Sequence, residues 1–272
     1  MNDSLSELLD CAKIAATAAG RHALDNTHRR TEALSITRHD IKLRLDVECQ
    51  TVATNEIHSR YPGASIIGEE DSPSVFDDDA SRKDNPGLDW VIDPIDGTVN
   101  FYHGLPQWCC SVAARRDKTS VVGVVYAPEL DALYAATTES PATVNDEPIH
   151  VSDVSTLENA LLLTSLNQKL DTDAPLDEMI SRISNSVRKT RVFGTAALDI
   201  CRVAHGQADA YWEPGNYIWD VAAAGLIVQQ AGGSASVLHM HDEPHRISYL
   251  ATNGILHERL SSILLQFNPA AK

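Results

Sequence analysis

The chain has 272 residues, and 43% of them are hydrophobic, which is enough to bury a sizeable core in one large domain or two packed halves. Its formal net charge of −16 at pH 7 repels nucleic acid and anionic membranes, so neither is an expected partner. The same charge opposes a phosphorylated ligand unless some carboxylates hold divalent cations. No run of about 18 apolar residues occurs, and the N-terminus lacks a signal-peptide pattern, so we expect a soluble, cytoplasmic protein.

The first predicted element is a helix over residues 4–25, where Ser4 can cap the helix, Glu7 follows three residues later, and apolar residues recur at helical spacing. Hydrophobic periodicity and turn residues then predict, in order, a polar link at 26–35, a helix at 47–61, a strand at 65–67, a surface loop at 71–87, a strand at 88–92, and antiparallel strands at 110–115, 120–127 and 132–137.

The second half alternates strands with helices, which is typical of α/β organisation. The predicted strands are 160–165, 189–193, 208–212, 234–238 and 247–251, and the predicted helices are 174–187, 195–206 and 219–231. Composition shifts near residues 138–150. We therefore expect an N-terminal α+β half over residues 1–140 and a C-terminal α/β half over residues 141–272.

The cysteines show no pattern of pairing. They are five in number, and they lack Cys-x-x-Cys or zinc-ligand spacing: Cys11, Cys49, Cys109, Cys110 and Cys201. Reduced, mostly buried thiols are therefore expected in place of disulfides or structural zinc.

The segment 93–98, Asp-Pro-Ile-Asp-Gly-Thr, follows a predicted strand and carries two carboxylates three residues apart. Pro fixes one backbone dihedral, and Gly lets the backbone come close to a ligand. If a helix begins at 97–98, its free N–H groups form an anion site beside the carboxylates. An ordinary turn with a capping Asp explains the isolated segment equally well.

Two further acidic positions follow the same logic. Glu69 and Glu70 end the strand at 65–67, and Asp220 opens the apolar helix at 219–231. Taken singly, they are explained as a solvated turn and a helix N-cap. Glu69, Asp93, Asp96 and Asp220 together offer only oxygen ligands, which select magnesium over zinc.

Over nearly its whole length, the sequence resembles the inositol monophosphatase family of lithium-sensitive, metal-dependent phosphatases. The segments that carry the resemblance are 61–62, 67–70, 90–101, 194–197, 208–213 and 219–222. The resemblance implies a layered α-β-α-β-α sandwich of the sugar-phosphatase type, a homodimer, and hydrolysis of a small phosphorylated metabolite such as inositol monophosphate.

By the same resemblance, two or three Mg²⁺ ions per site are held by Glu69, Asp93, the carbonyl of Ile95, Asp96 and Asp220. Gly97 and Thr98 bind the phosphate. The catalytic residues are Thr98, Asp46 and Glu69, which orient and deprotonate a water molecule activated by the metal. Such chemistry needs no covalent phosphoenzyme.

Residues Gly194, Thr195, Ala196 and Glu213 match positions that line the family's substrate pocket. A carboxylate at Glu213 can accept two hydrogen bonds from a polyol, which favours an inositol-like or sugar-like substrate. The alternative is a surface acid before Pro214-Gly215. Histidinol phosphate, fructose 1,6-bisphosphate and 3′-phosphoadenosine nucleotides are alternative substrates, and a catalytically weak regulatory binding protein is the alternative of another class.

The loop before Asp46 departs from the family pattern. Lys42-Leu43-Arg44-Leu45 replaces its usual Val-Thr pair, and Ser35 stands near its flap lysine, for which Arg38 or Lys42 can substitute. A third ion and the lithium response depend on this loop. Outside the motifs, His103 is interpreted as a loop residue, and His239, His241 and His245 as a solvated hairpin in place of a zinc site.

Overall fold

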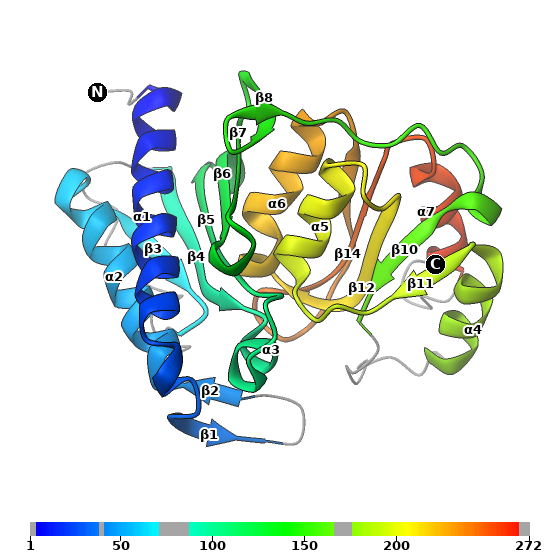
Figure 1. The fold of residues 1–272 in the computed structure, drawn as a ribbon. Coiled ribbons are helices and arrows are strands. Elements are labelled where there is room, and N and C mark those ends of the chain that lie inside the picture. The colour runs from blue at the N-terminus through cyan, green and yellow to red at the C-terminus, as the bar shows by residue number, and fades with distance from the viewer. Residues whose placement is uncertain (1–3, 38–40, 71–86, 166–175, 267–272) are drawn as a thin grey trace.

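The computed structural model describes residues 4–37, 41–70, 87–165 and 176–266. Within these residues, two sheets alternate with three layers of helices, so the predicted α-β-α-β-α arrangement is confirmed (Figure 1). The predicted loop at 71–87 lies outside the described residues except for Gly87, and Arg38 lies outside them too.

The first sheet runs in the order β3-β4-β5-β6-β7-β8-β9, with β3 and β4 parallel and the other pairs antiparallel. Its strands are β3 (Ser65–Gly68), β4 (Leu88–Asp96), β5 (Cys109–Arg116), β6 (Thr119–Ala127), β7 (Ala132–Thr137), β8 (Ser140–Val144) and β9 (Glu147–Pro148). β4 extends past the predicted end at residue 92. Its register shifts between Asp93 and Asp96, and Pro94 fits there because an irregularity needs no ladder N–H.

Helices α1 (Leu5–Asp25) and α2 (Arg44–Arg60) cover the outer face of this sheet. The predicted cap of α1 is confirmed, because the Glu7 N–H donates to Ser4 Oγ and the Ser4 N–H donates to Glu7 Oε2. The predicted start of the second helix at residue 47 is three residues late. Asp46 Oδ2 accepts the Leu43 N–H at 2.7 Å, and this cap lets the helix begin at Arg44.

The polar link predicted at 26–35 contains a strand that periodicity could not reveal. β1 (Ala33–Ile36) pairs antiparallel with β2 (Ile41–Leu43), and a short 3₁₀ turn at Thr27–Arg29 precedes them. Two such short strands carry too few residues to show alternation.

The second sheet runs in the order β11-β10-β12-β14-β13. Its strands are β10 (Leu161–Thr164), β11 (Lys189–Arg191), β12 (Ala210–Tyr217), β13 (Ser234–Met240) and β14 (Arg246–Thr252). The predicted alternation of strands and helices is confirmed, although β12 continues past residue 212 through another register shift between Glu213 and Asn216. Two further 3₁₀ turns occupy Pro128–Leu130 and Leu157–Asn159.

Helices α5 (Ala196–Ala204) and α6 (Ile218–Gln230) lie between the two sheets, and α4 (Leu176–Ser186) and α7 (His257–Leu265) cover the outer face of the second sheet (Figure 1). Nearly all of α6 is buried because it contacts a sheet on each side. At Gly123 in β6, an added Cβ would lie 2.5 Å from the Ala223 carbonyl oxygen of α6. The central layer therefore packs backbone against backbone.

The first sheet ends at Pro148, just beyond the boundary expected at residue 140. Between the two sheets, the central layer forms one hydrophobic core, and separate cores lie under α1 with α2 and under α4 with α7. The division into two halves stays an interpretation of the sequence.

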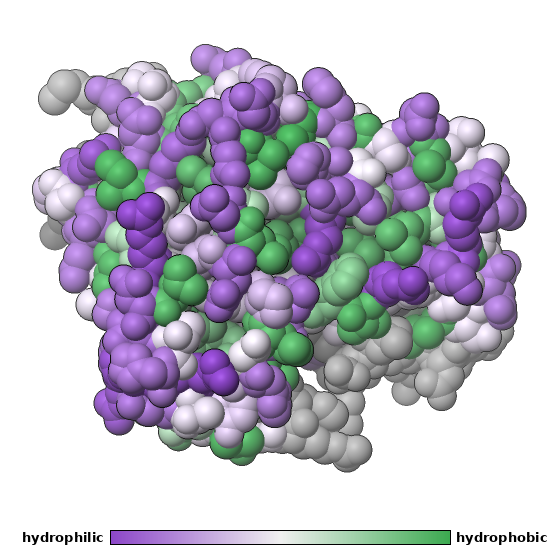
Figure 2. All heavy atoms as spheres, viewed as in Figure 1, coloured by the Kyte–Doolittle hydropathy of each residue, from purple (hydrophilic) through white to green (hydrophobic). Residues whose placement is uncertain are grey.

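The molecular surface is mostly polar on the face that Figure 2 shows. Hydrophilic residues cover most of the face shown in Figure 2, and hydrophobic residues lie between them in small groups. Among the described helices, none combines the length and apolar content needed to cross a membrane. All five cysteines are buried and free, as predicted.

Candidate active site

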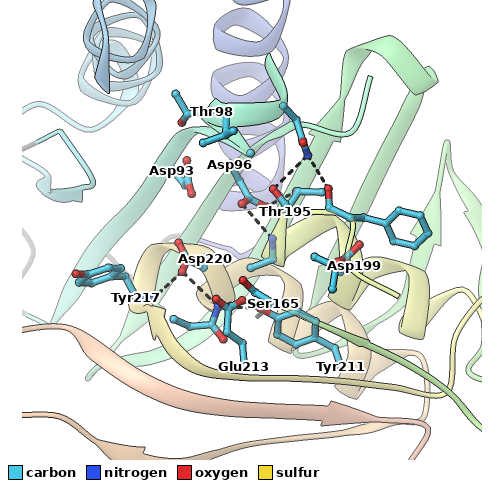
Figure 3. A pocket seen from close by; sticks show the side chains of 18 of the residues that line it. Asp93, Asp96, Thr98, Ser165, Thr195, Asp199, Tyr211, Glu213, Tyr217 and Asp220 are labelled. Carbon is cyan, nitrogen blue, oxygen red and sulfur yellow. Dashed lines mark hydrogen bonds between the residues drawn. The ribbon is translucent and has the colours of Figure 1, made fainter. Parts of the chain in front are cut away.

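A cavity of about 800 Å³ lies where the end of β4 meets the starts of α5 and α6. It gathers nearly every residue predicted for the site, namely Glu69, Asp93, Ile95, Asp96, Gly97, Thr98, Gly194, Thr195, Ala196, Glu213 and Asp220. Figure 3 shows Asp93, Asp96 and Thr98 on one side, Asp220 facing them, and Glu213 beyond Asp220. Segments that are more than 100 residues apart in the chain therefore meet here.

The turn after β4 needs glycine at position 97. Gly97 has φ 92°, in the left-handed region, and an added Cβ would lie 2.9 Å from the Gln107 carbonyl oxygen. Helix α3 (Thr98–His103) begins at the next residue, and no side chain caps it. Thr98 Oγ1 donates to the Ile95 carbonyl at 2.9 Å. The expected helix start is confirmed, and Gly97, Thr98 and Val99 line the cavity.

Asp96 is held by the N-terminus of α5. Its Oδ2 accepts the Thr195 hydroxyl at 2.5 Å and the Ala197 N–H at 2.7 Å, and its Oδ1 accepts the Ala196 N–H at 3.1 Å. Burial raises the pKa of Asp96, and these donors oppose the rise. Thr195 and Ala196, expected only to line the substrate pocket, thus also fix a predicted metal ligand.

Backbone N–H groups also hold the other two aspartates. Asp93 Oδ1 accepts the Ile95 N–H at 3.1 Å, and Asp220 Oδ2 accepts the Tyr217 N–H at 2.7 Å. Burial raises the pKa of Asp93 well above its usual range, and the negative charges of Glu69, Asp96 and Asp220 raise it further. Asp220 shows the same rise, again from burial first and then from the charges of Asp96 and Glu69.

The donor chemistry of this cluster fits a hard divalent cation. Its side chains offer only oxygen atoms, and the charge of Glu69 is one of the causes that raise the pKa of Asp93. A cation between them removes the mutual repulsion that raises these pKa values. Within the described ranges, no group of three or more acidic, histidine or cysteine side chains is close enough to form a preformed metal site. The ligand set predicted from the sequence stays a prediction.

Asp46 lies in the first turn of α2 and is not among the residues that line the cavity. It is 2% exposed and caps α2 through the Leu43 N–H, and its pairing with Thr98 stays a prediction. Beside it, Lys42 Nζ lies 2.6 Å from Glu70 Oε2. Burial lowers the pKa of Lys42, but the hydrogen bond to Glu70 and the charges of Glu70, Glu69 and Asp46 raise it overall. Lys42 is therefore a cation at the acidic edge of the site.

Glu213 is 6% exposed and is not the surface acid that the sequence left open. Its Oε2 accepts the Tyr211 hydroxyl at 2.6 Å. Burial raises the pKa of Glu213, although hydrogen bonds from Tyr211, Ser165 and Asn216 lower it. A carboxylate with this much hydrogen bonding is built into the wall of the cavity.

Sequence reasoning did not single out several polar residues of the cavity wall, including Asn100, Asp199 and Asn216. Asn100 Nδ2 donates to the Phe193 carbonyl at 2.7 Å and to the Gln107 carbonyl at 2.8 Å. It therefore ties α3 to the segment that carries Gly194. The signal available for Asn100 was its place in the motif at 90–101, whereas nothing in the sequence marks Asp199 or Asn216.

The histidines lie elsewhere. His103 is exposed, as expected, but it is the last residue of helix α3 and not part of a loop. His239 and His241 meet edge to face on the hairpin of β13 and β14, and His241 Nε2 lies 2.7 Å from the Pro214 carbonyl oxygen. The hairpin is confirmed, and the described residues hold no histidine metal cluster.

Known proteins are similar to this chain in fold and in sequence. A model of the inositol monophosphatase family matches residues 4–266. Inositol monophosphatase 1 of Solanum lycopersicum is 35% identical over 236 residues, 85% of each chain, and Nus factor SuhB of Pasteurella multocida is 33% identical over 232 residues, 84% of each chain. The solved inositol monophosphatase of Anabaena (Nostoc) superposes with a TM-score of 0.79 at 32% identity, covering 97% of this chain and 98% of that one.

These matches extend over both sheets and all three helical layers, and so over every segment that contributes to the cavity. The chain therefore belongs to the inositol monophosphatase family and is a phosphoric monoester hydrolase.

Proposed function

We propose that the chain hydrolyses the phosphate monoester of a small polyol in a magnesium-dependent reaction, with inositol monophosphate as the leading substrate. The observation that carries this proposal is that buried Glu213 lines the same cavity as Glu69, Asp93, Asp96 and Asp220 and lies on the far side of Asp220 from Asp93 and Asp96 (Figure 3). One wall is suited to cations and phosphate, and the other is suited to hydroxyl groups.

The acidic wall would hold two or three Mg²⁺ ions through Glu69, Asp93, Asp96, Asp220 and the carbonyl of Ile95. When bound, magnesium would neutralise the phosphate charge, lower the pKa of water and stabilise the leaving alkoxide. A free lone pair supports this assignment, because Oδ1 of Asp96 accepts a single N–H among the described side-chain contacts. This oxygen is therefore held in place by a hydrogen bond and can still bind a magnesium ion.

The chain's own groups would then orient the reactants. The first N–H groups of α3, at Gly97 and Thr98, would bind phosphate oxygens, as exposed N–H groups at helix starts do. Thr98 and Asp46 would orient the attacking water, and Glu69 would accept its proton. Asn100 supports this arrangement because it keeps the phosphate turn and the Gly194 segment in fixed relation.

Glu213 would select the alcohol part of the substrate. A carboxylate accepts hydrogen bonds and repels a second anionic group, so this wall favours a polyol over a bisphosphate. The net charge of −16 opposes nucleic acid and anionic membranes as partners. We further propose a cytoplasmic homodimer, which light scattering of the purified protein would test.

The test is phosphate release with Mg²⁺ from inositol monophosphate, histidinol phosphate, fructose 1,6-bisphosphate, a 3′-phosphoadenosine nucleotide and 4-nitrophenyl phosphate. Glu213→Gln should lower kcat/KM for inositol monophosphate about tenfold or more, which corresponds to about 1.4 kcal/mol. Turnover of 4-nitrophenyl phosphate, which lacks polyol hydroxyls, should stay near the wild-type value.

Glu147→Gln, at an exposed position of β9, is the matched control. Preference for a bisphosphate, or equal losses for all substrates in Glu213→Gln, would overturn the polyol assignment.

A further inference from the structure

Asn216 connects the two walls of the cavity. The residue lies in β12 directly after the register shift, is 1% exposed and lines the cavity. Its Nδ2 is 2.8 Å from Tyr211 Oη, 3.3 Å from Glu213 Oε2 and 3.4 Å from Asp220 Oδ2. One amide group therefore touches the carboxylate proposed for substrate hydroxyls and a carboxylate proposed for magnesium.

The orientation of this amide follows from its neighbours. With Nδ2 toward Glu213 and Asp220, the amide donates to two carboxylates, whereas the flipped amide would place Oδ1 against them. In the observed orientation, Oδ1 is buried and has no hydrogen-bond partner within the described residues. A buried acceptor without a partner costs stability, which offsets part of what the hydrogen bonds donated by Nδ2 contribute.

The contacts of Asn216 fix the plane of one carboxylate. Nδ2 donates to the Tyr211 hydroxyl, which in turn donates to Glu213 Oε2, and Nδ2 also reaches the same Oε2 directly. Two donors converge on that oxygen from different directions. Rotation of the Glu213 carboxylate would break both contacts, so Asn216, together with Ser165, holds its orientation toward the cavity.

We propose that Asn216 is a positioning residue that determines substrate specificity by holding Glu213 in the orientation that accepts the substrate's hydroxyl groups. The inference rests on the proposed function, because it gives Glu213 the role of recognising a polyol. It adds a residue that acts through Glu213. The buried, unpartnered Oδ1 of Asn216 lowers stability, and this loss accompanies the placement of the Nδ2 donor beside Glu213.

The test is a double-mutant cycle of Asn216→Leu and Glu213→Gln, with Asn216→Ala as the smaller replacement should leucine not fit. Asn185→Leu, at an exposed position of α4, is the control. Asn216→Leu should raise KM for inositol monophosphate about tenfold and leave kcat/KM for 4-nitrophenyl phosphate within about threefold. The double variant should be no worse than Glu213→Gln alone.

Equal losses for both substrates, or losses that add to those of Glu213→Gln, would overturn the inference. If no phosphate ester is turned over, the proposed function fails. The double-mutant cycle is then measured through the Tm values of the variants without substrate. Tm shifts that depart from additivity by about 2 °C or more support the positioning role, and additive shifts contradict it.

Discussion

Asp199 shows how burial changes the chemistry of one side chain in this cavity. It is 2% exposed in α5, and Arg202 Nη1 donates to its Oδ1. Burial raises the pKa of Asp199 to about 7, although the charge and hydrogen bond of Arg202 lower it. The folded protein therefore keeps a proton on Asp199 in mildly acidic solution, where the unfolded chain has released it.

The raised pKa of Asp199 has a defined effect on stability. Its contribution is fully present below the unfolded pKa of about 4 and is lost as the pH rises through about 7, because the folded state binds more protons in that window. Asp199→Asn has no such proton to lose. The unfolding free energy of wild type relative to Asp199→Asn should fall by up to about 1.4 kcal/mol per pH unit between pH 5 and 7.

Urea unfolding at pH 5, 6, 7 and 8 measures this difference, and Asp10→Asn, at an exposed position of α1, is the control. Parallel stability curves for the wild type and Asp199→Asn would show that Asp199 titrates normally in the folded protein.

Single residues also show how far the sequence alone could reach. The acids of 93–98 were predictable because two carboxylates, proline and glycine in that order restrict the backbone and supply ligands. The contact of Thr195 with Asp96 was not, because it joins residues 99 positions apart. Asn216 carries no local signal either, since its role depends on a register shift in β12 and on side chains brought near by folding.

At the scale of elements, hydrophobic periodicity located most strands and helices but not their ends. α2 begins earlier than periodicity predicts because the Asp46 cap is polar, and β4 continues through Pro94 because the register shift needs no N–H there. The pairs β1–β2 and β8–β9 are too short to show a period, and α7 was not predicted at all. Hydrophobic periodicity indicates which face of a helix or strand is buried, whereas the residue at which the element ends depends on single polar contacts.

The packing of α6 on β6 gives a prediction at this scale. Gly123→Ala would place a Cβ 2.5 Å from the backbone oxygen of Ala223, so the helix and strand must move apart. We expect a loss of about 1–3 kcal/mol in unfolding free energy, as for other small-to-large changes in a packed core. Denaturant unfolding measures the loss, with exposed Thr119→Ala on the same strand as the control.

An unchanged stability of Gly123→Ala would contradict this prediction, because it would mean that α6 and β6 can accommodate an added methyl group without moving apart. The cavity depends on this layer, because α6 carries Asp220 and β4 carries Asp93. A shift of α6 should therefore also reduce phosphatase activity.

For the whole molecule, the order of the layers decides where the chemistry occurs. α5 and α6 lie between the two sheets, and their N-termini meet the end of β4, so carboxylates from distant parts of the chain share one cavity. The pattern of elements alone predicted α/β organisation, and the full layered sandwich came from the resemblance to a known family. Sheet order depends on contacts between distant segments, which a local pattern does not contain.

The claim that connects all three scales is that this acidic cavity is a magnesium-dependent phosphatase site. The direct measurement is phosphate release from inositol monophosphate by the purified protein, with Mg²⁺, with excess chelator, and with Mg²⁺ restored. The same assay is run on Asp93→Asn and on the exposed control Asp10→Asn.

We predict that chelation abolishes phosphate release, that Mg²⁺ restores it, and that Asp93→Asn lowers it about a hundredfold or more while the protein remains folded. Release that continues in the chelator, or a folded Asp93→Asn variant with wild-type activity, would contradict the account.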